Sequence, residues 1–244
     1  MKRWKNIMLL LLAFTVQTGA QTVTKGAENM DTFMIGKDTL KLHFFGHASL
    51  MLEYRDRCIY FDPVNPYANY RFLPKADMIL ITHEHRDHLD TAVIAEIRKD
   101  GTHILANEKA AAQIPDAAAM HSGESREIFG IGILAVPAYN TTKGREKYHP
   151  KGNGNGYILN LGSRHIYIAG DTEDIPEMKK LGPVEIAFLP VNQPYTMTVE
   201  QVAGAAKTIR PKILYPYHYD NTDLSPLLRK LRNSGIEVRI RDME

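Results

Sequence analysis

The chain of 244 residues contains a single cysteine, Cys58, and a single tryptophan. One cysteine cannot form a disulfide within the chain, and it excludes zinc and iron–sulfur sites that need several thiolates. None of the serines lies in a Gly-x-Ser-x-Gly or Ser-x-x-Lys motif, so a serine nucleophile has no obvious position. A metal site in this chain would therefore use histidine and carboxylate ligands, and the ten histidines supply the candidates.

The sequence also lacks an apolar run long enough to span a bilayer as a helix, which needs about 20 residues. The apolar run 7–16 is half that length. Lys2, Arg3 and Lys5 precede it, and small residues follow it. This arrangement predicts a secretory signal peptide over residues 1–20, with an uncleaved membrane anchor as the alternative. We therefore expect an exported protein, periplasmic or secreted, with no stable membrane insertion after cleavage of the signal.

The chain has almost no net charge once the predicted signal peptide, residues 1–20, is removed. The whole chain carries a net charge of +2, but residues 1–20 hold three basic and no acidic side chains, so the remainder carries −1. A nucleic-acid partner has no electrostatic support in such a chain, and we expect a small-molecule substrate as the partner. The oligomeric state is left open. Residues 21–37 are polar and are predicted to form a leader before a domain that spans residues 38–244.

Strand-like and helix-like segments alternate through that domain, with strands dominant in its first half. Strands are expected at 40–45, 49–54, 58–61, 78–82, 104–106, 131–136, 157–161, 165–169, 184–190, 213–217 and 236–240. Helices are expected from a cap at Asp90 to Lys99, at 109–113, from the capping box Thr198-x-x-Gln201 to Ile209, and after Ser225-Pro226. No linker separates the halves, which indicates one α/β (α+β) domain with two sheets and helices outside them.

A dense group of metal-binding residue types follows the buried strand at 78–82, in the segment Thr82-His-Glu-His-Arg-Asp-His88. His83 and His85 are two residues apart, so in an extended backbone they project to the same side. Asp87 and His88 point elsewhere as the chain turns. Two diverging pairs of donors suit two adjacent metal ions better than one. A zincin helix is excluded because the residue four after His83 is Asp87 rather than histidine. A solvated polar turn is the structural alternative.

This segment resembles the His-x-His-x-Asp-His signature of the metallo-β-lactamase-fold hydrolases. Tyr167-Ile-Ala-Gly-Asp-Thr172 is similar to the strand-Gly-Asp-Thr turn of that family, and Pro216-Tyr-His-Tyr219 is similar to the segment that carries its last ligand histidine. With Phe45-Gly-His-Ala48 and Phe61-Asp-Pro63, the likeness extends from about Leu40 to the C-terminus. It looks closest to the branch that includes the ascorbate-6-phosphate lactonase. The resemblance implies a four-layer αββα sandwich.

The resemblance also implies the ligands and the reaction. Asp171 would bridge two divalent metal ions, and Asp87 would both ligate and orient the nucleophile. Neutral imidazoles suit Zn²⁺, with Mn²⁺ or Fe²⁺ as alternatives. A hydroxide held between the ions would attack an ester, lactone, amide or phosphodiester bond of a small molecule. The implied metal ligands are His83, His85, Asp87, His88, Asp171 and His218.

One position departs from the family pattern. The first metal of the family takes a third histidine from a turn that corresponds to Ala135-Val-Pro-Ala-Tyr-Asn140, where Asn140 replaces it. Either Asn140 contributes an amide oxygen, or His149 reaches back to the site, or the first site is weakened. We favour His149 because imidazole binds these metals better than an amide does. The departure keeps two alternatives open: a metal-binding protein with a degenerate first site, and an iron redox variant of the fold.

Four further residues are weaker candidates for contacts around the ions and the substrate. His47, in an expected hairpin turn, and Asp62, before Pro63, could orient ligand imidazoles, although both residue types also occur in ordinary turns. Tyr139 and Lys151 could hold an oxyanion or an anionic group, although exposed loops often carry both types.

Overall fold

The computed structural model describes residues 29–243, in which two seven-stranded sheets face one another. The expected signal peptide, residues 1–20, lies outside the described range. The first sheet consists of β1 (Met30–Ile35), β2 (Asp38–Gly46), β3 (Ser49–Tyr54), β4 (Arg57–Phe61), β5 (Met78–Ile81), β6 (His103–Ala106) and β7 (Ala118–Ala119). The second consists of β8 (Ser125–Ile128), β9 (Ile131–Ala138), β10 (Gly154–Leu161), β11 (Arg164–Ile168), β12 (Ile186–Pro190), β13 (Ile213–Tyr217) and β14 (Glu237–Val238).

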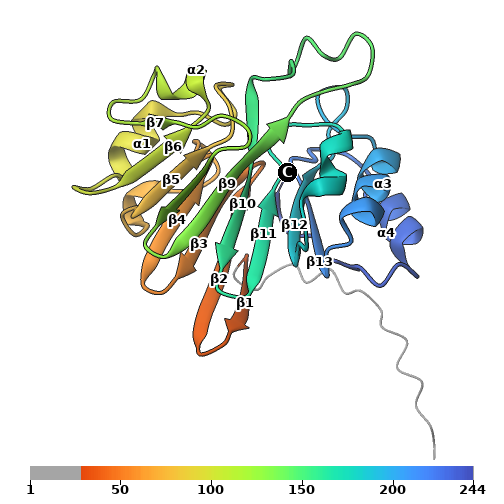
Figure 1. Cartoon of the computed structure of the whole chain (residues 1–244), viewed down its shortest axis with the longest axis horizontal. Coiled ribbons are helices and arrows are strands. Elements are labelled where there is room, and N and C mark those ends of the chain that lie inside the picture. The colour runs from red at the N-terminus through yellow and green to blue at the C-terminus, as the bar shows by residue number, and fades with distance from the viewer. Residues whose placement is uncertain (1–28, 244) are drawn as a thin grey trace, which may run out of the picture.

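Helices cover the outer faces of both sheets. The helical segments are η1 (Tyr70–Phe72), α1 (Thr91–Ile97), α2 (Glu108–Ala111), η2 (Pro176–Lys180), α3 (Val199–Ile209) and α4 (Ser225–Leu231). In Figure 1, α1 and α2 lie outside the first sheet and α3 and α4 outside the second. This is the αββα sandwich expected from the sequence. No helix within residues 29–243 is long and apolar enough to cross a membrane.

Each sheet changes from antiparallel to parallel pairing along its width. Strands β1 to β4 pair antiparallel, and β4 to β7 pair parallel. In the second sheet β8 to β11 pair antiparallel, and β11 to β14 pair parallel. Because parallel strands end at the same edge, the carboxyl ends of β4, β5, β11 and β13 can all deliver residues to one edge of the sandwich.

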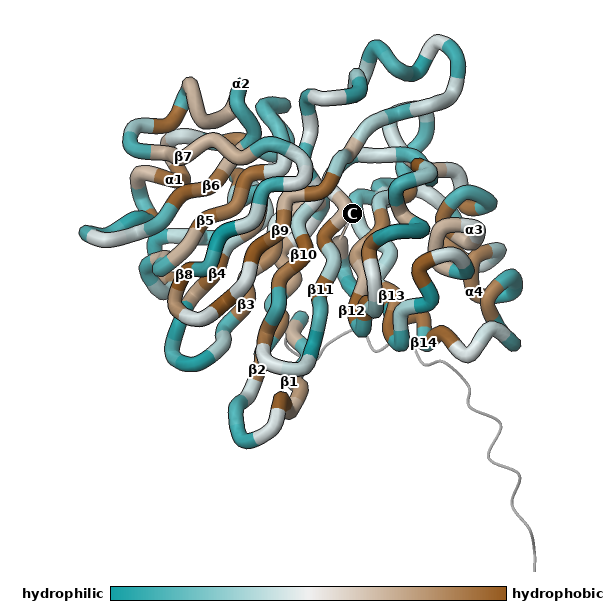
Figure 2. Tube along the Cα trace, viewed as in Figure 1, coloured by the Kyte–Doolittle hydropathy of each residue, from teal (hydrophilic) through white to brown (hydrophobic). Residues whose placement is uncertain are grey.

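Apolar side chains fill the space between the sheets and beneath the helices. Every residue of β5 and of β12 is buried, as their uninterrupted apolar sequences predict for central parallel strands. Figure 2 shows the hydrophobic residues along these strands and the hydrophilic ones at the turns. A second apolar cluster joins the outer face of the first sheet to α1, where Val93, Ile94 and Ile97 are buried. The core therefore fixes the ends of the central strands.

Local capping signals set the starts of two helices. The Asp90 side chain accepts hydrogen bonds from the backbone N–H of Ala92 and Val93, so α1 begins where the sequence predicts, although it ends at Ile97 rather than Lys99. The capping box of Thr198 and Gln201 opens α3, which confirms that prediction. The helix expected after Ser225-Pro226 is also present, as α4.

The prediction of a leader over residues 21–37 is wrong for its second half, where a strand begins at Met30. Residues 21–37 were predicted to precede the fold, but β1 (Met30–Ile35) pairs with β2 along its whole length. The strand escapes recognition because it is an edge strand in which only Ile35 is buried and the other residues are partly buried or exposed. Polar Asp31 and Thr32 also interrupt its apolar pattern. The short strands β7 and β8 escape for the same reason, since both carry partly buried or exposed residues. Residues 21–28 lie outside the described range.

The two sheets approach closely at the edge where these strand ends meet. Tyr157 Oη in β10 donates a hydrogen bond to the carbonyl oxygen of Ile81 at 2.9 Å. Gly170 adopts φ +64°, and a Cβ atom there would lie 2.6 Å from the carbonyl oxygen of Asn155 and 3.2 Å from Thr82 Cβ. Only glycine fits this turn without strain. The turn therefore carries Asp171 directly towards the loop that follows β5.

Candidate functional site

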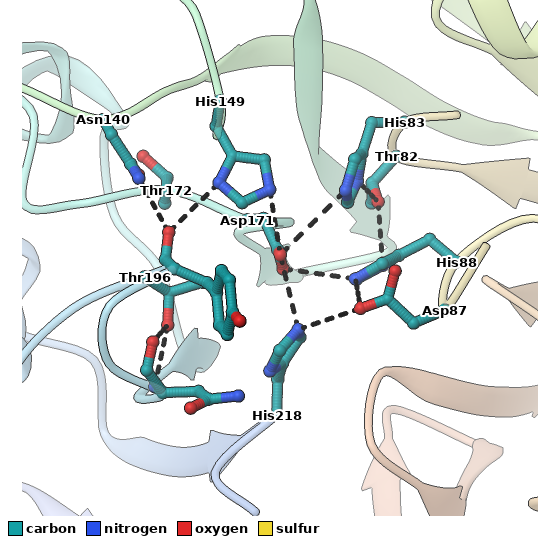
Figure 3. A network of polar contacts seen from close by, with 12 residues as sticks. Thr82, His83, Asp87, His88, Asn140, His149, Asp171, Thr172, Thr196 and His218 are labelled. Atoms are coloured by element: carbon teal, nitrogen blue, oxygen red, sulfur yellow. Dashed lines mark hydrogen bonds and ion pairs between the residues drawn. The ribbon is translucent and has the colours of Figure 1, made fainter. Parts of the chain in front are cut away.

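Strand ends from both sheets assemble the predicted ligands into one group. His83 follows β5, Asp171 follows β11 through Gly170, and His218 follows β13. Figure 3 shows these side chains converging on one region together with His88 and His149. His218 adopts φ +49°, and its backbone N–H donates to the carbonyl oxygen of His47 at 2.9 Å. The fold thus joins residues that are far apart in the sequence.

Three overlapping sets of side chains could each hold a metal ion. In each set, one donor atom per residue lies within 4.8 Å of the others. The sets are His83, His85 and His149; His47, Asp87, His88 and His218; and His83, His88 and Asp171. Since His83 and His88 each belong to two sets, the sets describe one continuous centre with room for adjacent ions.

His149, rather than Asn140, stands beside the first pair of histidines. His149 Nε2 lies 3.2 Å from Asp171 Oδ2, and its Nδ1 lies 3.1 Å from the carbonyl oxygen of Tyr195. The Asn140 amide donates to that same carbonyl oxygen at 2.7 Å and to the carbonyl oxygen of Arg145 at 3.3 Å. In Figure 3 the His149 ring lies between Asn140 and Asp171. His149 thus lies in the cluster, and Asn140 donates a hydrogen bond to the Tyr195 carbonyl oxygen that His149 also contacts.

His88 is oriented by a buried carboxylate. Asp62 accepts hydrogen bonds from the backbone N–H of Thr82 at 2.8 Å and from its hydroxyl at 2.7 Å. His88 Nδ1 lies 2.8 Å from the same carboxylate, so Nδ1 carries the proton and donates to Asp62. His88 Nε2 then faces the cluster, where it can ligate a metal ion once it has released its proton. This is the orienting contact that the sequence suggested for Asp62.

Asp87 lies at the open side of the cluster, next to His47. Its carboxylate oxygen Oδ2 is 3.2 Å from His47 Nε2, and 45% of its side chain is exposed. The His47 ring lies against the His218 ring, with a centroid distance of 3.6 Å, and parallel to the Tyr67 ring at 5.5 Å. His47 is therefore held in place on two faces and can fix the direction of Asp87.

Asp171 is the carboxylate common to the cluster. Its oxygens lie 3.4 Å from His88 Nε2, 3.2 Å from His149 Nε2 and 3.3 Å from His218 Nε2, and 3.9 Å from His83 Nε2. The side chain is 3% exposed. A carboxylate in this position can contact two cations at once, which is the bridging role that the resemblance implies.

The buried donor atoms fit bound metal ions. Several ring nitrogens of the cluster and one carboxylate oxygen are buried, yet make no hydrogen bond within the described chain: His83 Nε2, His88 Nε2, His149 Nε2, both ring nitrogens of His218, and Asp171 Oδ1. Buried polar atoms normally find a partner. Uncharged imidazole nitrogens and a carboxylate are the ligand types that Zn²⁺, Mn²⁺ and Fe²⁺ accept. The donor set and its arrangement therefore match a metal centre.

Burial and neighbouring charges determine which side chains of the cluster are neutral and which are charged. Burial, with the charge of His88, lowers the pKa of His83 well below its usual range, so His83 is neutral at pH 7. Burial raises the pKa of Asp171, but the charges of His218 and His88 outweigh it and hold that pKa well below the usual range. Burial likewise opposes the ionisation of His218, but the Asp171 charge raises the pKa of His218 to about 9. Asp171 is thus ionised at pH 7, and a negatively charged carboxylate attracts cations.

Tyr139 and Lys151, suggested as contacts to an oxyanion, both contact Glu177. Tyr139 Oη donates to Glu177 Oε2 at 2.8 Å, and Lys151 Nζ lies 3.2 Å from Tyr139 Oη and 3.1 Å from Glu177 Oε1. Neither residue lines the cleft beside the cluster. These contacts join the loop between β9 and β10 to Glu177 of η2.

Two glutamates that the sequence analysis did not single out, the half-buried Glu84 and the buried Glu173, hold the site loops. Glu84 accepts hydrogen bonds from the side-chain amides of Asn107 at 2.9 Å and Asn153 at 3.0 Å, which lowers the pKa of Glu84 to about 2 although burial opposes this. Glu173 accepts from the backbone N–H of Thr141 at 2.8 Å and Thr142 at 2.6 Å. No local motif marks either role, because the partners come from other loops.

A cleft of about 350 Å³ opens beside the cluster. Its volume is within the range of small-molecule sites. Asn192, Tyr148, Tyr195 and Asp220 form its walls next to the metal-binding residues, and the sequence analysis identified none of these four. The cleft is lined by His47, His85, Asp87, Tyr148, His149, Asp171, Asn192, Tyr195, His218 and Asp220.

Comparisons with known proteins agree with this geometry. A family model described as a beta-lactamase superfamily domain matches residues 41–218. A UPF0173 metal-dependent hydrolase of Pyrococcus horikoshii is 34% identical, over 74% of this chain and 85% of its own. A crystal structure of a proposed metal-dependent hydrolase from Parabacteroides distasonis superposes with a TM-score of 0.87, at 51% identity over 88% of this chain and 99% of its own. The metallo hydrolase Igni18 of Ignicoccus hospitalis gives 0.71 at 27% identity, over 84% and 96%.

The αββα fold, the histidine and aspartate cluster and these likenesses together define a metal-dependent hydrolase of the metallo-β-lactamase superfamily. Such enzymes share a fold and a centre, whereas the substrate is set by the loops around the cleft. Within that superfamily, this chain belongs to the family of UPF0173 metal-dependent hydrolases.

Proposed function

We propose that this protein uses two divalent metal ions, Zn²⁺ in the first instance, to hydrolyse an ester, lactone, amide or phosphodiester bond of a small molecule. The observation that carries the proposal is the set of buried ring nitrogens that make no hydrogen bond within the described residues and converge around Asp171. Three imidazoles, those of His83, His85 and His149, can hold one ion. Asp87, His88 and His218 can hold the other.

The residues around the centre have separable tasks in this reaction. When bound, the metal ions lower the pKa of a water towards about 7 and polarise the bond to be cut. Asp62 fixes the tautomer of His88 through its hydrogen bond to Nδ1. His47 contacts Asp87 at the open side of the cluster, where Asp87 can accept a hydrogen bond from the attacking water. Asp171, buried and ionised, offsets the mutual repulsion of the cations.

The position of His149 supports a complete first site. A degenerate site was one reading of Asn140, because the amide stands where the family has a histidine. His149 instead lies 3.2 Å from Asp171, and its other ring nitrogen contacts the Tyr195 carbonyl oxygen. An imidazole whose second nitrogen is fixed in this way is oriented as a metal ligand normally is. This favours two metal sites over one.

Two finer features complete the proposal. The motifs around His83 and Asp171 resemble the ascorbate-6-phosphate lactonase branch, which favours a cyclic ester as the bond that is cut. Residues 1–20 have the composition of a secretory signal, so we propose that the enzyme acts in the periplasm or outside the cell.

Metal analysis combined with a hydrolysis panel tests this function. We expect about two Zn²⁺ per chain in the purified protein, and hydrolysis of p-nitrophenyl acetate, bis(p-nitrophenyl) phosphate or a simple lactone. A chelator should abolish that hydrolysis, and added Zn²⁺ should restore it. His83→Ala should lose metal and activity, whereas His121→Ala, at an exposed histidine outside the cluster, should retain both.

Three outcomes would contradict the proposal. Hydrolysis that survives complete removal of the metal would exclude a metal-dependent reaction. One ion or none per chain would favour the degenerate site. Iron with a redox-active spectrum, and no hydrolysis of any member of the panel, would favour an iron redox variant of the fold.

A further inference from the structure

The cleft beside the metal cluster is lined by histidines, carboxylates, one amide and two tyrosines, with no lysine or arginine among its lining residues. Three basic residues of the adjoining 143–151 loop have partners within the described residues. Lys147 Nζ lies 5.0 Å from the centroid of the Tyr148 ring, outside the lining of the cleft. Arg145 pairs with Glu173 at 3.3 Å, and Lys151 pairs with Glu177 at 3.1 Å. Away from the metal centre, a phosphate or carboxylate on the substrate would therefore meet no lysine or arginine among the lining residues, although such groups are normally bound by those side chains.

One wall of the cleft is a paired amide and carboxylate. Asn192 Nδ2 donates to Asp220 Oδ2 at 2.7 Å, and Asp220 Oδ1 lies 3.4 Å from His47 Nδ1. The Asp220 side chain is 47% exposed, whereas Asn192 is buried. An ionised carboxylate only accepts hydrogen bonds, so the exposed part of Asp220 favours hydroxyl or ammonium donors and repels anions.

The other wall is aromatic. The rings of Tyr148 and Tyr195 meet edge to face, with their centroids 5.0 Å apart. Within residues 29–243 neither hydroxyl has a hydrogen-bond partner, and 45% of Tyr195 is exposed. Such a pair offers one aromatic ring face and one ring edge together with free hydroxyl groups, which suits the carbon face of a small hydroxylated or amine-bearing molecule.

We propose that this cleft selects small substrates that carry a hydroxyl or ammonium group beyond the reacting bond, and that it rejects phosphorylated ones. Asp220 is the residue that sets this preference, with Asn192 holding its carboxylate in place. The inference rests on the proposed hydrolase function and narrows its substrate class: the sequence motifs resemble a lactonase of a phosphorylated compound, whereas the walls of this cleft favour an unphosphorylated one.

Calorimetric binding to the full-length, Zn²⁺-loaded protein tests the preference without any turnover. Three sugar acids share the same carboxylate and differ in one group: D-gluconate, D-glucosaminate with an ammonium group, and 6-phospho-D-gluconate. We expect the first two to bind at least about tenfold more tightly than the phosphorylated acid, because Asp220 attracts their donors and repels the phosphate. The wild-type ranking alone tests the proposal, independently of any variant.

A matched pair of variants assigns the effect to Asp220. Asp220→Asn keeps an oxygen acceptor for Asn192 but removes the charge, so the affinity for D-glucosaminate should fall roughly two- to fivefold, as expected for a partly exposed charge pair. The affinity for 6-phospho-D-gluconate should stay the same or rise. Asp223→Asn makes the same change at an exposed position outside the cleft and should leave all three affinities unchanged.

The result that overturns the inference is equal or tighter binding of the phosphorylated acid, or binding of none of the three. Identical behaviour of the two variants would overturn the assignment to Asp220. If the ranking holds while every ester and lactone of the hydrolysis panel remains intact, the proposed reaction fails and the selectivity of the cleft stands. If hydrolysis occurs and the ranking is reversed, only the inference about the substrate class fails.

Discussion

His149 and Asn140 come from the same segment after β9 and perform different tasks around one carbonyl oxygen. Both contact the Tyr195 carbonyl, His149 through Nδ1 at 3.1 Å and Asn140 through its amide nitrogen at 2.7 Å. Only His149 also reaches Asp171. A contact that fixes the second nitrogen of a ligand histidine normally contributes 10- to 100-fold to metal affinity. Asn140, at the position where the family has a histidine, therefore supports the carbonyl oxygen that orients His149. His149 is the candidate ligand that takes the place of that histidine.

This division of roles predicts different metal contents for two alanine variants. His149→Ala should lower the bound metal from about two ions per chain towards one, because the first site keeps only His83 and His85. Asn140→Ala should still bind two ions at saturating Zn²⁺, with an affinity about tenfold weaker. Metal titration followed by elemental analysis measures both. Retention of two ions by His149→Ala, with loss of one by Asn140→Ala, would instead make Asn140 the ligand.

At the scale of elements, buried carboxylates fix the loops that carry the ligands. The side chain of Glu173 is fully buried and accepts hydrogen bonds from two successive backbone N–H groups, those of Thr141 and Thr142, and it pairs with Arg145. Burial raises the pKa of Glu173, but the hydrogen bonds from Thr141 and Thr142 outweigh it and lower that pKa. The turn after β11 thereby holds the segment that leads to His149.

Glu173→Gln should loosen that segment. The neutral amide loses the charge-assisted hydrogen bonds and turns an NH₂ group towards donors, which should cost about 2 kcal/mol of unfolding free energy. The Zn²⁺ affinity of the His149 site should fall with it. Urea unfolding and metal titration measure the two effects. Asp174→Asn makes the same change at the next residue, which is exposed and bonded to Gln201, and it should alter neither quantity. Equal effects of the two variants would remove Glu173 from this role.

Elements with a strong local signal were predictable, whereas those defined by partners were not. The apolar sequences of β5 and β12, the Asp90 cap and the Thr198 capping box each specify their structure locally, so the sequence predicted them. The strand β1 has half-buried residues and only β2 as a neighbour, so its pairing depends on the rest of the sheet. The elements that can be predicted from the sequence are thus those whose own residues carry a strong apolar or capping pattern.

The same distinction applies to the site. The motif from His83 to His88 is contiguous and could be recognised, and the resemblance to the metallo-β-lactamase-fold hydrolases then indicated Asp171 and His218, which the structure brings beside it. The walls of the cleft come from three separate loops, and Tyr148, Asn192 and Asp220 are common loop residues with no distinguishing spacing. Their approach depends on the packing of the whole sandwich. This is why the metal-binding chemistry was predictable and the selectivity of the cleft was not.

At the scale of the whole molecule, one carboxylate ties the first strand to the second sheet and to the end of the chain. Asp31 in β1 contacts Arg241 at 2.6 Å and Arg239 at 3.3 Å, and it accepts a hydrogen bond from the Tyr215 hydroxyl in β13. The Asp31 side chain is only 13% exposed. This cluster joins residues about two hundred positions apart and closes the sandwich on the side of β1 and β14.

Asp31 should make the stability of the fold depend on pH. Burial raises the pKa of Asp31, but the hydrogen bonds from Arg241 and Tyr215 outweigh it, so the pKa in the folded protein lies below the ordinary 3.8. A carboxyl whose pKa is lower in the folded state stabilises the protein above its unfolded pKa, and this contribution is lost as the pH falls through the folded pKa.

Asp31→Asn should therefore cost about 1–2 kcal/mol of unfolding free energy at pH 7, a value reduced for partial exposure. The difference from wild type should shrink below pH 4. Asp38→Asn removes the more exposed ion pair with Arg55 and should cost less than about 0.5 kcal/mol. Urea denaturation from pH 3 to 8 measures these differences, and a constant Asp31→Asn effect across that range would show that the ionisation of Asp31 does not stabilise the fold.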